Sequence, residues 1–302
     1  MSETIPAEPG ASDYEIYKEG FHDRLSRYWP EPREQLHAGG WQRTHQMLRD
    51  IHHLSAIHGC GRIRQALDLC CGEGATAVYV AAKEGWEVTG VEIVPTAAKV
   101  ARARAKAYGD VVRVRIVPQP GHDGAASAVQ LQLSYTAVED LVRFAAASCH
   151  YMPLPSNSYD LVYGQDPDGL ANEYRIHAFK EILRVLRPGG LFYFWHHWIP
   201  GPGWPAELLH EYGTDPVTGS PRLSFEQYVE DLEASGLQLV SATDCTDLAA
   251  RHMGSMAARM RAEAGLGQAD PLPDRWLDRS LQFAQRGGTM GIAAVAIKPK
   301  QQ

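Results

Sequence analysis

The residues with the clearest chemical potential form the stretch "ALDLCCGEG" at positions 66–74. It contains an acid, Asp68, followed by two adjacent cysteines and the glycines Gly72 and Gly74. Because glycine has no side chain, its backbone can approach a ligand closely. Adjacent cysteines do not readily bridge each other, and no nearby residues complete a zinc set. The pattern therefore indicates a glycine turn that binds a ligand, in which the cysteines are incidental.

The composition of the chain predicts its cellular compartment and excludes two classes of partner, nucleic acids and membranes. The five cysteines are an odd number without a C-x-x-C pair, which favours free thiols and predicts a cytoplasmic protein. The formal net charge is −7 with no long basic run, so we expect no nucleic-acid partner. No segment approaches the ~18 uninterrupted apolar residues of a membrane span, so we expect no membrane partner.

Two predicted strands flank the glycine turn. The run 64–71 is short and mostly apolar, as expected for a buried parallel strand, and 75–85 is an alanine-rich helix that ends at a glycine. A second strand over 86–92 finishes at Glu92, 20 residues beyond Gly72. A carboxylate at that place can accept hydrogen bonds from both hydroxyls of a ribose. Glycines and acid together predict a cofactor that contains a nucleoside.

The residues around the turn favour one such cofactor. The three-glycine spacing of dinucleotide folds is absent, and Asp68 would repel a pyrophosphate but suits a cation. The stretch resembles the first signature of the class I S-adenosylmethionine-dependent methyltransferases, an acid and an apolar residue before G-x-G-x-G. Cys70 stands at the place of the first glycine. The resemblance implies S-adenosylmethionine as cofactor, bound by Asp68, Gly72, Gly74 and Glu92.

The same resemblance implies the fold. The family has an α/β, Rossmann-like, seven-stranded, mostly parallel sheet with helices on both faces, and later apolar runs and helical patterns fit it. "LHAGGW" (36–41) looks like the H-x-G-x-W loop of small-molecule enzymes, so we expect an N-terminal helical lid over 13–60 with His37 at the donor or acceptor. Residues 1–12 read as a disordered leader and 61–302 as the methyltransferase domain.

The third strand of the sheet has two possible positions. In the family, an acid at its end reaches the adenine amino group; aligning "FAAASCHYMPLPSNSYDLV" puts Ser148 there, beside Cys149, and implies that both contact the cofactor. Residues 118–141 are then an insertion, which we prefer. Alternatively, "VVRVRIV" (111–117) is the third strand and the Ser148 assignment shifts.

Polar residues after the next two strands indicate the acceptor site, because open α/β sheets bind ligands outside the carboxyl ends of their strands. Gln165 belongs to "YGQD", which looks like the W-x-Q-D segment of sarcosine and dimethylglycine enzymes and implies a cofactor contact. Asp166 could orient or deprotonate an acceptor, or be a turn residue. His196 or His197 could supply a base, and Trp198 could line the pocket; the alternative is one buried and one solvated histidine.

These observations predict methyl transfer to a small-molecule acceptor. We expect N- or C-methylation rather than O-methylation of a catechol, because the sequence shows no metal-ligand set. The alternative is an enzyme of the same fold that binds S-adenosylmethionine but performs a non-methylating reaction such as cyclisation. The sequence leaves the acceptor unnamed and is compatible with a homo-oligomer.

Overall fold

The computed structural model describes residues 37, 39–120, 126–167, 170, 174–196, 224–264 and 291–300. Seven strands form one sheet in the order β5-β2-β1-β6-β7-β9-β8. Their bounds are β1 Gln65–Leu69, β2 Glu87–Glu92, β5 Val142–Ala146, β6 Tyr159–Gln165, β7 Leu186–His196, β8 Gln238–Asp244 and β9 Ile292–Ile297. The first five are parallel, and β9 runs antiparallel to β7 and β8. The predicted seven-stranded, mostly parallel sheet is confirmed.

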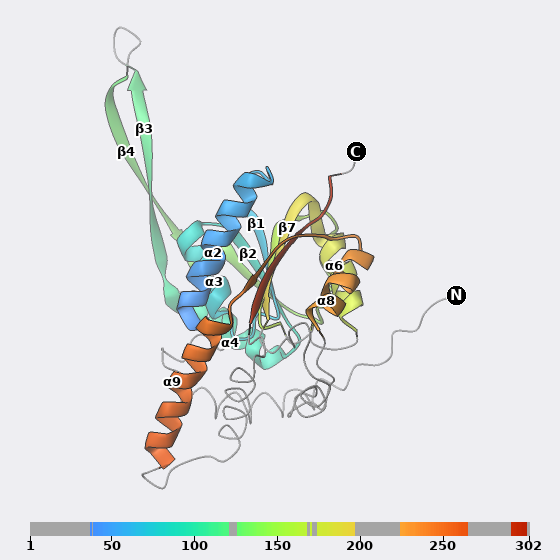
Figure 1. Ribbon diagram of the computed structural model, residues 1–302. Coiled ribbons are helices and arrows are strands. Elements are labelled where there is room, and N and C mark those ends of the chain that lie inside the picture. Colours follow the sequence, from blue (N-terminus) through green and yellow to red (C-terminus); the bar gives the residue numbers. More distant parts are fainter. Residues whose placement is uncertain are drawn as a thin grey trace, which may run out of the picture.

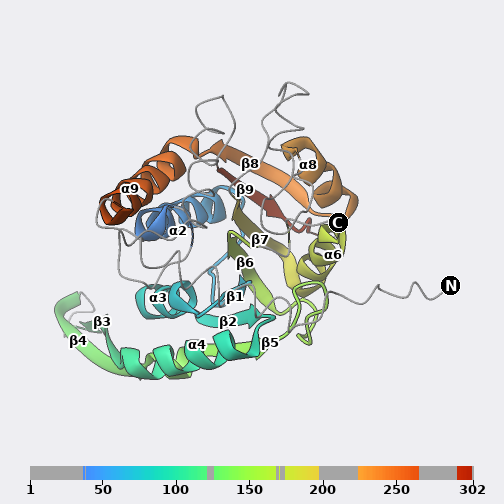
Figure 2. The same ribbon diagram turned by 90° about the horizontal axis from the view of Figure 1, so that it is seen from below.

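Helices cover both faces of this sheet. The described helices are α2 Gly40–Ile57, α3 Ala75–Glu84, α4 Pro95–Tyr108, α5 Val138–Leu141, α6 Arg175–Val185, α8 Phe225–Ala234 and α9 Thr246–Ala264. α2, α3 and α9 lie on one face, and α6 and α8 lie on the other (Figures 1 and 2). α8 begins with the capping box expected from its sequence, since Ser224 Oγ accepts from the Gln227 amide and the Gln227 side chain accepts from the Ser224 amide.

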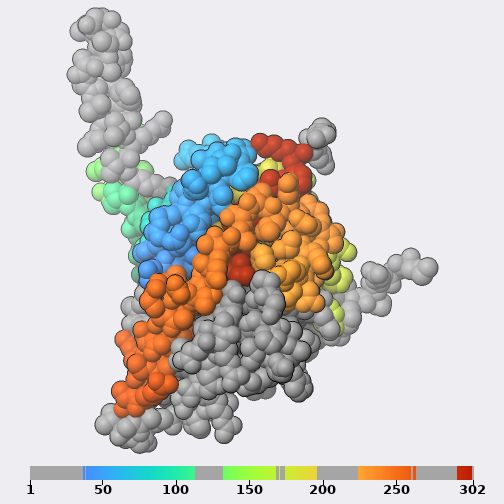
Figure 3. Space-filling model, in the orientation of Figure 1, coloured from blue at the N-terminus to red at the C-terminus, as the bar shows by residue number. Residues whose placement is uncertain are grey.

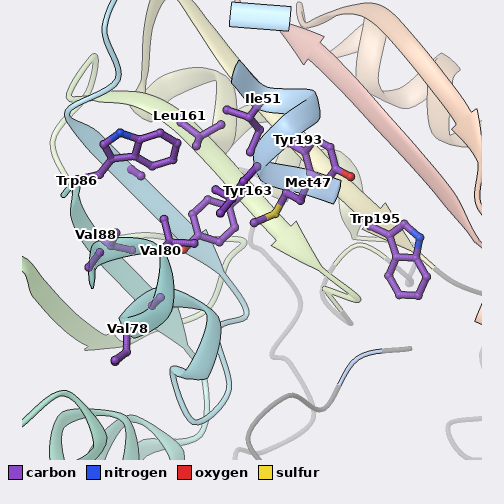
Figure 4. Packing of buried hydrophobic residues seen from close by; sticks show 14 of the residues in the cluster. Met47, Ile51, Val78, Val80, Trp86, Val88, Leu161, Tyr163, Tyr193 and Trp195 are labelled. Carbon is purple, nitrogen blue, oxygen red and sulfur yellow. The ribbon is translucent and has the colours of Figure 1, made fainter. Parts of the chain in front are cut away.

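The core beneath α2 fixes that helix to the sheet. Met47, Leu48 and Ile51 of α2 are buried, and burial of such side chains contributes roughly 1.5–3 kcal/mol each. They pack on side chains from β6 and β7 (Figure 4), namely Leu161, Tyr163, Tyr193 and Trp195. α2 therefore contributes to the core, and the division between lid and methyltransferase domain at residue 60 stays a prediction.

Much of the predicted N-terminal region lies outside the described residues. This applies to the leader over 1–12 and to the part of the predicted lid before residue 37. His37 itself is described and lies just before α2. Among the described residues, we find no helix with the length and apolar character needed to cross a membrane.

A long hairpin stands outside the main sheet. β3 (Asp110–Pro120) and β4 (Ala126–Ala137) pair antiparallel in a separate two-stranded sheet that extends away from the body (Figure 1). Its base closes where the Val138 amide donates to the Gly109 carbonyl at 3.0 Å. The expected start of the insertion at residue 118 is therefore wrong, because that position falls inside β3. Its expected end at 141 includes α5, whose Val138 is buried in the body.

The alternative third strand over 111–117 is also wrong. β5 is the strand that pairs in parallel with β2, from Val88↔Val142 to Glu92↔Ala146. Apolar and polar residues alternate in "VRVRIV", a pattern that suits a two-sided ribbon better than the continuous apolar strand of a buried parallel sheet. Ser148 accordingly follows the third strand of the parallel set.

Candidate functional site

The glycine turn, residues 70–74, connects β1 to α3 at the carboxyl edge of the sheet, the edge at which the parallel strands end. Cys70, Gly72 and Gly74 have φ values of 55°, 53° and 73°, all in the left-handed region. A Cβ on Gly72 would meet nothing within 4 Å, whereas one on Gly74 would lie 2.7 Å from Ala101 Cβ and from the Phe144 ring. Gly72 thus leaves space for a ligand, while Gly74 is required for packing of the turn.

Cys70 occupies a backbone conformation that favours glycine. The first glycine of the family motif is absent, yet the chain keeps the left-handed φ there. A side chain with a Cβ in this region costs about 1–2 kcal/mol. The departure from the motif therefore changes the side chain and adds strain without changing the course of the turn.

Glu92 is tied directly to the glycine turn. Its carboxylate is 1% exposed; Oε2 accepts from the Gly72 amide at 2.9 Å and Oε1 from the Val94 amide at 3.1 Å. These two amides hold the carboxylate at the end of β2. The arrangement can present both oxygens to two neighbouring hydroxyls, as a ribose requires.

Asp68 provides a second buried carboxylate beneath the turn. It is 3% exposed, and Oδ2 has no hydrogen-bond partner within the part of the chain that the structure describes. Burial raises the pKa of Asp68 well above its ordinary value; the neighbouring Tyr163 hydroxyl opposes that rise and Glu92 adds to it. A cation bound nearby would stabilise the ionised form. Tyr163, which lies opposite Asp68 in the β1–β6 register, was not identified from the sequence because it reads as an ordinary strand residue.

Ser148 and Cys149 lie just beyond β5. Ser148 Oγ accepts from the His150 amide at 3.2 Å and lies 3.2 Å from His150 Nδ1, while Cys149 is buried in the core. The backbone there is joined to β2, since the Ala147 amide donates to the Glu92 carbonyl at 3.0 Å. Ser148 is thus near Glu92 along the sheet edge, and its contact with adenine stays a prediction.

Gln165 joins three elements at the end of β6. Its Oε1 accepts from the hydroxyls of Thr44 in α2 and Thr76 in α3, at 3.0 and 3.3 Å. Thr44 Oγ1 also lies 3.2 Å from His37 Nε2, and because that hydroxyl donates to Gln165, this contact requires a proton on Nε2. Gln165 Nε2 is buried and has no hydrogen-bond partner among the described residues, which leaves a donor for a ligand. The two threonines had no sequence motif to reveal them.

Asp166 follows Gln165 in a strained conformation. Its φ is 54°, and its amide donates to the Trp195 carbonyl at 2.8 Å, which fixes it between β6 and β7. Non-glycine residues in this region of φ cluster at functional sites. The Asp166 carboxylate interacts electrostatically with Arg43 of α2 and His252 of α9.

His252 is a further ionisable residue at this edge that the sequence did not identify. It is 9% exposed, and burial lowers its pKa from 6.5 to about 4, although Asp166 opposes this change. α9, which carries it, lies beside α2 on the surface (Figure 3). In the sequence His252 stands next to Met253 in a helix that reads as core, and only the packing of α9 brings it to Asp166.

The structure describes only some of the remaining predicted site residues. His37 is buried with its ring 6.2 Å from that of Trp195. The backbone of His196 pairs with Ile292 at the end of β7, and its side chain is not described. His197 and Trp198 lie outside the described residues. Within the described ranges, no group of three His, Cys, Asp or Glu side chains could hold a metal ion.

Comparison with known proteins points to one family. Two family models, each described as a methyltransferase domain, match residues 66–141 and 121–194, which include the glycine turn and the end of β6. The chain is 26% identical over 234 residues to Methyltransferase GfsG of Streptomyces halstedii, covering 73% of this chain and 67% of that one. It is 27% identical over 240 residues to 27-O-demethylrifamycin SV methyltransferase of Amycolatopsis mediterranei, covering 75% and 74%.

Solved structures share the fold. A Haemonchus contortus phosphoethanolamine N-methyltransferase 2, solved with phosphomonomethylethanolamine and S-adenosylhomocysteine, gives a TM-score of 0.71 at 17% identity and covers 98% of this chain and 62% of that one. The [4+2]-cyclase SpnF gives a TM-score of 0.64 at 19% identity and covers 99% of this chain and all of that one. At these identities the likeness is one of fold.

The geometry fits the cofactor of that family. The open space at Gly72, the tethered Glu92 carboxylate and the unpaired oxygen of Asp68 suit a ligand with a ribose and a positive charge. Together with the family models and relatives, these features support a class I S-adenosylmethionine-dependent methyltransferase of small-molecule type, with S-adenosylmethionine as its cofactor.

Proposed function

We propose that this chain transfers the methyl group of S-adenosylmethionine to a small molecule bound at the carboxyl ends of β6 and β7. The observation that carries the proposal is the hydrogen bond from the Gly72 amide to Glu92 Oε2, which joins the glycine turn to the ribose-binding acid within the matched residues. When bound, S-adenosylmethionine supplies an electrophilic methyl group on a cationic sulfur.

The protein's own task is to hold the two reactants in line and to keep water out. Glu92 and Gly72 would fix the nucleoside, and Asp68 would lie near the positive charge. Gln165, held by Thr44 and Thr76, would offer its amide nitrogen from the acceptor side of the turn. His37, on Thr44, would border the same space.

The class of acceptor atom can be argued from whether the site offers a base that removes a proton during methyl transfer. A hydroxyl needs a base as the methyl group is transferred, whereas a neutral amine or an alkene attacks with its own electron pair and gives up a proton only afterwards. Asp166 and His252 lie together at this edge and could take that proton, and one relative is named as a methyltransferase of 27-O-demethylrifamycin SV. We therefore propose a hydroxyl acceptor first. The expectation of N- or C-methylation rested on the missing metal set, which weighs only against metal-dependent catechol chemistry.

A non-methylating reaction is the second candidate. The fold likeness to the [4+2]-cyclase SpnF over almost the whole chain favours it. In that case the residues around Asp166 would bind a substrate that changes without consuming the cofactor.

The two candidates differ in what becomes of the cofactor. The purified protein is incubated with S-adenosylmethionine and a panel of polyhydroxylated compounds, amines and prenyl diphosphates, and S-adenosylhomocysteine is measured beside each product. We expect a methylated product and S-adenosylhomocysteine in equal amounts. A substrate converted without S-adenosylhomocysteine would reject methyl transfer.

The cofactor assignment has its own test by calorimetry. Glu92→Ala removes the ribose acceptor and leaves two amides without their partner, so binding should weaken by about 1–3 kcal/mol. Glu87→Ala, at the exposed start of the same strand, is the matched control and should leave affinity unchanged. Equal affinities in a folded Glu92→Ala variant would contradict the ribose assignment.

A further inference from the structure

The β3–β4 hairpin has two unequal edges. β3 contains Pro118 and Pro120, which lack an amide proton, and two arginines, Arg113 and Arg115. β4, "ASAVQLQLSYTA", contains no charged residue, no proline and no glycine over 12 residues. Proteins usually protect exposed strand edges with prolines and charges, because free amides and carbonyls pair readily with another chain. The sequence of β3 therefore contains both kinds of protective residue, and the sequence of β4 contains neither.

Exposed apolar side chains lie on β4 and on its partner strand β3. Tyr135 and Leu133 of β4 are 67% and 55% exposed, and Val112 of β3 is 54% exposed. Val112 pairs with Tyr135 in the hairpin register, and Leu133 is two residues from Tyr135, so all three lie on one face. Clustered exposed apolar residues on a single face are typical of interaction surfaces.

The hairpin also has little support from the rest of the molecule. A two-stranded ribbon is only marginally stable in water unless further strands or a packing surface join it. Between the described residues, β3 and β4 pair only with each other, and they extend away from the body (Figures 1 and 2). A third strand along β4 would supply the missing support.

We propose that β4 pairs antiparallel with β4 of a second copy of this chain, which forms a four-stranded sheet across a two-fold axis. An antiparallel strand pair is self-complementary under two-fold symmetry. Because β4 carries no charge, self-pairing brings no like charges together, although each chain has a net charge of −7. Pairing of β3 with its own copy would instead bring two pairs of arginines together. The charge pattern thus favours β4 over β3 as the edge, and self-complementarity under two-fold symmetry fits an identical chain as the partner.

The oligomeric state of the full chain tests this proposal. Sedimentation should give twice the 33.3 kDa of one chain, and the double variant Leu133→Lys, Tyr135→Lys should give a monomer. Both side chains are exposed, so the variant should fold and bind S-adenosylmethionine as the wild type does. The matched control is Ile57→Lys, Val100→Lys, which changes two exposed apolar residues on α2 and α4 and should remain a dimer.

A second measurement separates strand pairing from contact between other surfaces. In the wild-type dimer, amide hydrogen exchange along β4 should be slower than in the lysine double variant. A monomeric wild type, a double variant that stays dimeric, or a wild-type dimer with unprotected β4 amides would each overturn the proposal. Since cofactor binding is measured separately, failure here leaves the methyltransferase assignment intact.

Discussion

The substitution His252→Gln should remove a pH dependence of stability that the fold creates. In the unfolded chain this histidine gains its proton near pH 6.5, whereas in the folded protein burial lowers its pKa to about 4. Between these values the unfolded state binds the extra proton, so the free energy of unfolding falls as the pH decreases. A fall in pKa from 6.5 to about 4 corresponds to roughly 3 kcal/mol between neutral pH and pH 4.

Urea unfolding, followed by tryptophan fluorescence at several pH values between 7 and 4, measures the effect. Other groups titrate in this range as well, so the informative quantity is the difference between wild type and variant at each pH. His252→Gln should lose less stability on acidification than the wild type, by up to about 3 kcal/mol at pH 4. His53→Gln, on the exposed side of α2, is the control and should keep the wild-type slope.

Equal slopes in His252→Gln and the wild type would refute the reasoning, because they would show that His252 is as readily protonated in the folded protein as in the unfolded chain. The expected result also bears on catalysis. A buried histidine that is neutral at pH 7, next to the Asp166 carboxylate, is in the protonation state that a base requires.

Two further predictions concern the glycine turn. Cys70→Gly should raise the free energy of unfolding in urea titrations by up to about 1 kcal/mol, because glycine removes the cost of the left-handed φ but increases the entropy of the unfolded chain. Cys71→Gly is the control, since Cys71 has no positive φ, and it should not be stabilised. A destabilised Cys70→Gly variant would contradict this account. Binding of S-adenosylmethionine should release protons, because its positive charge favours the ionised form of Asp68, whose pKa is raised by burial. Calorimetry of the wild type in buffers of different ionisation enthalpy should show this release. An unchanged release in Asp68→Asn would assign the proton to another group.

Local patterns in the sequence were sufficient to predict the fold and to choose cofactor-site candidates that the fold brings together. The glycines, the alanine-rich helix and Glu92 occur within one strand–helix–strand unit, so their relative positions follow from the unit itself. The hairpin was harder, because β3 continues directly from Gly109 without a linker and the alternation of its residues also fits a sheet strand. The residues of β3 alone do not show that this strand pairs with β4 in a hairpin and not with β2 in the main sheet.

Candidates beyond the cofactor turn could be proposed only where a strand end marks them. Gln165 ends the apolar strand β6 and Asp166 follows it, which is why both were proposed. Thr44, Tyr163 and His252 belong to three different elements and carry no motif. Thr44 and His252 come to Gln165 and Asp166 because α2 and α9 pack side by side, and that packing cannot be read from periodicity within any one element (Figure 3).

The position of β9 between β7 and β8 has a consequence for synthesis on the ribosome. β8 ends at Asp244, but its sheet neighbour, β9, begins only at Ile292, after α9. Until that later segment emerges, β8 has no strand to pair with, and one side of β7 is unpaired as well. The strands around Glu92 and Gln165 are made earlier and can pair among themselves. We therefore expect the strands of the cofactor-binding half to pair first in the nascent chain, and β9 to complete the other edge afterwards.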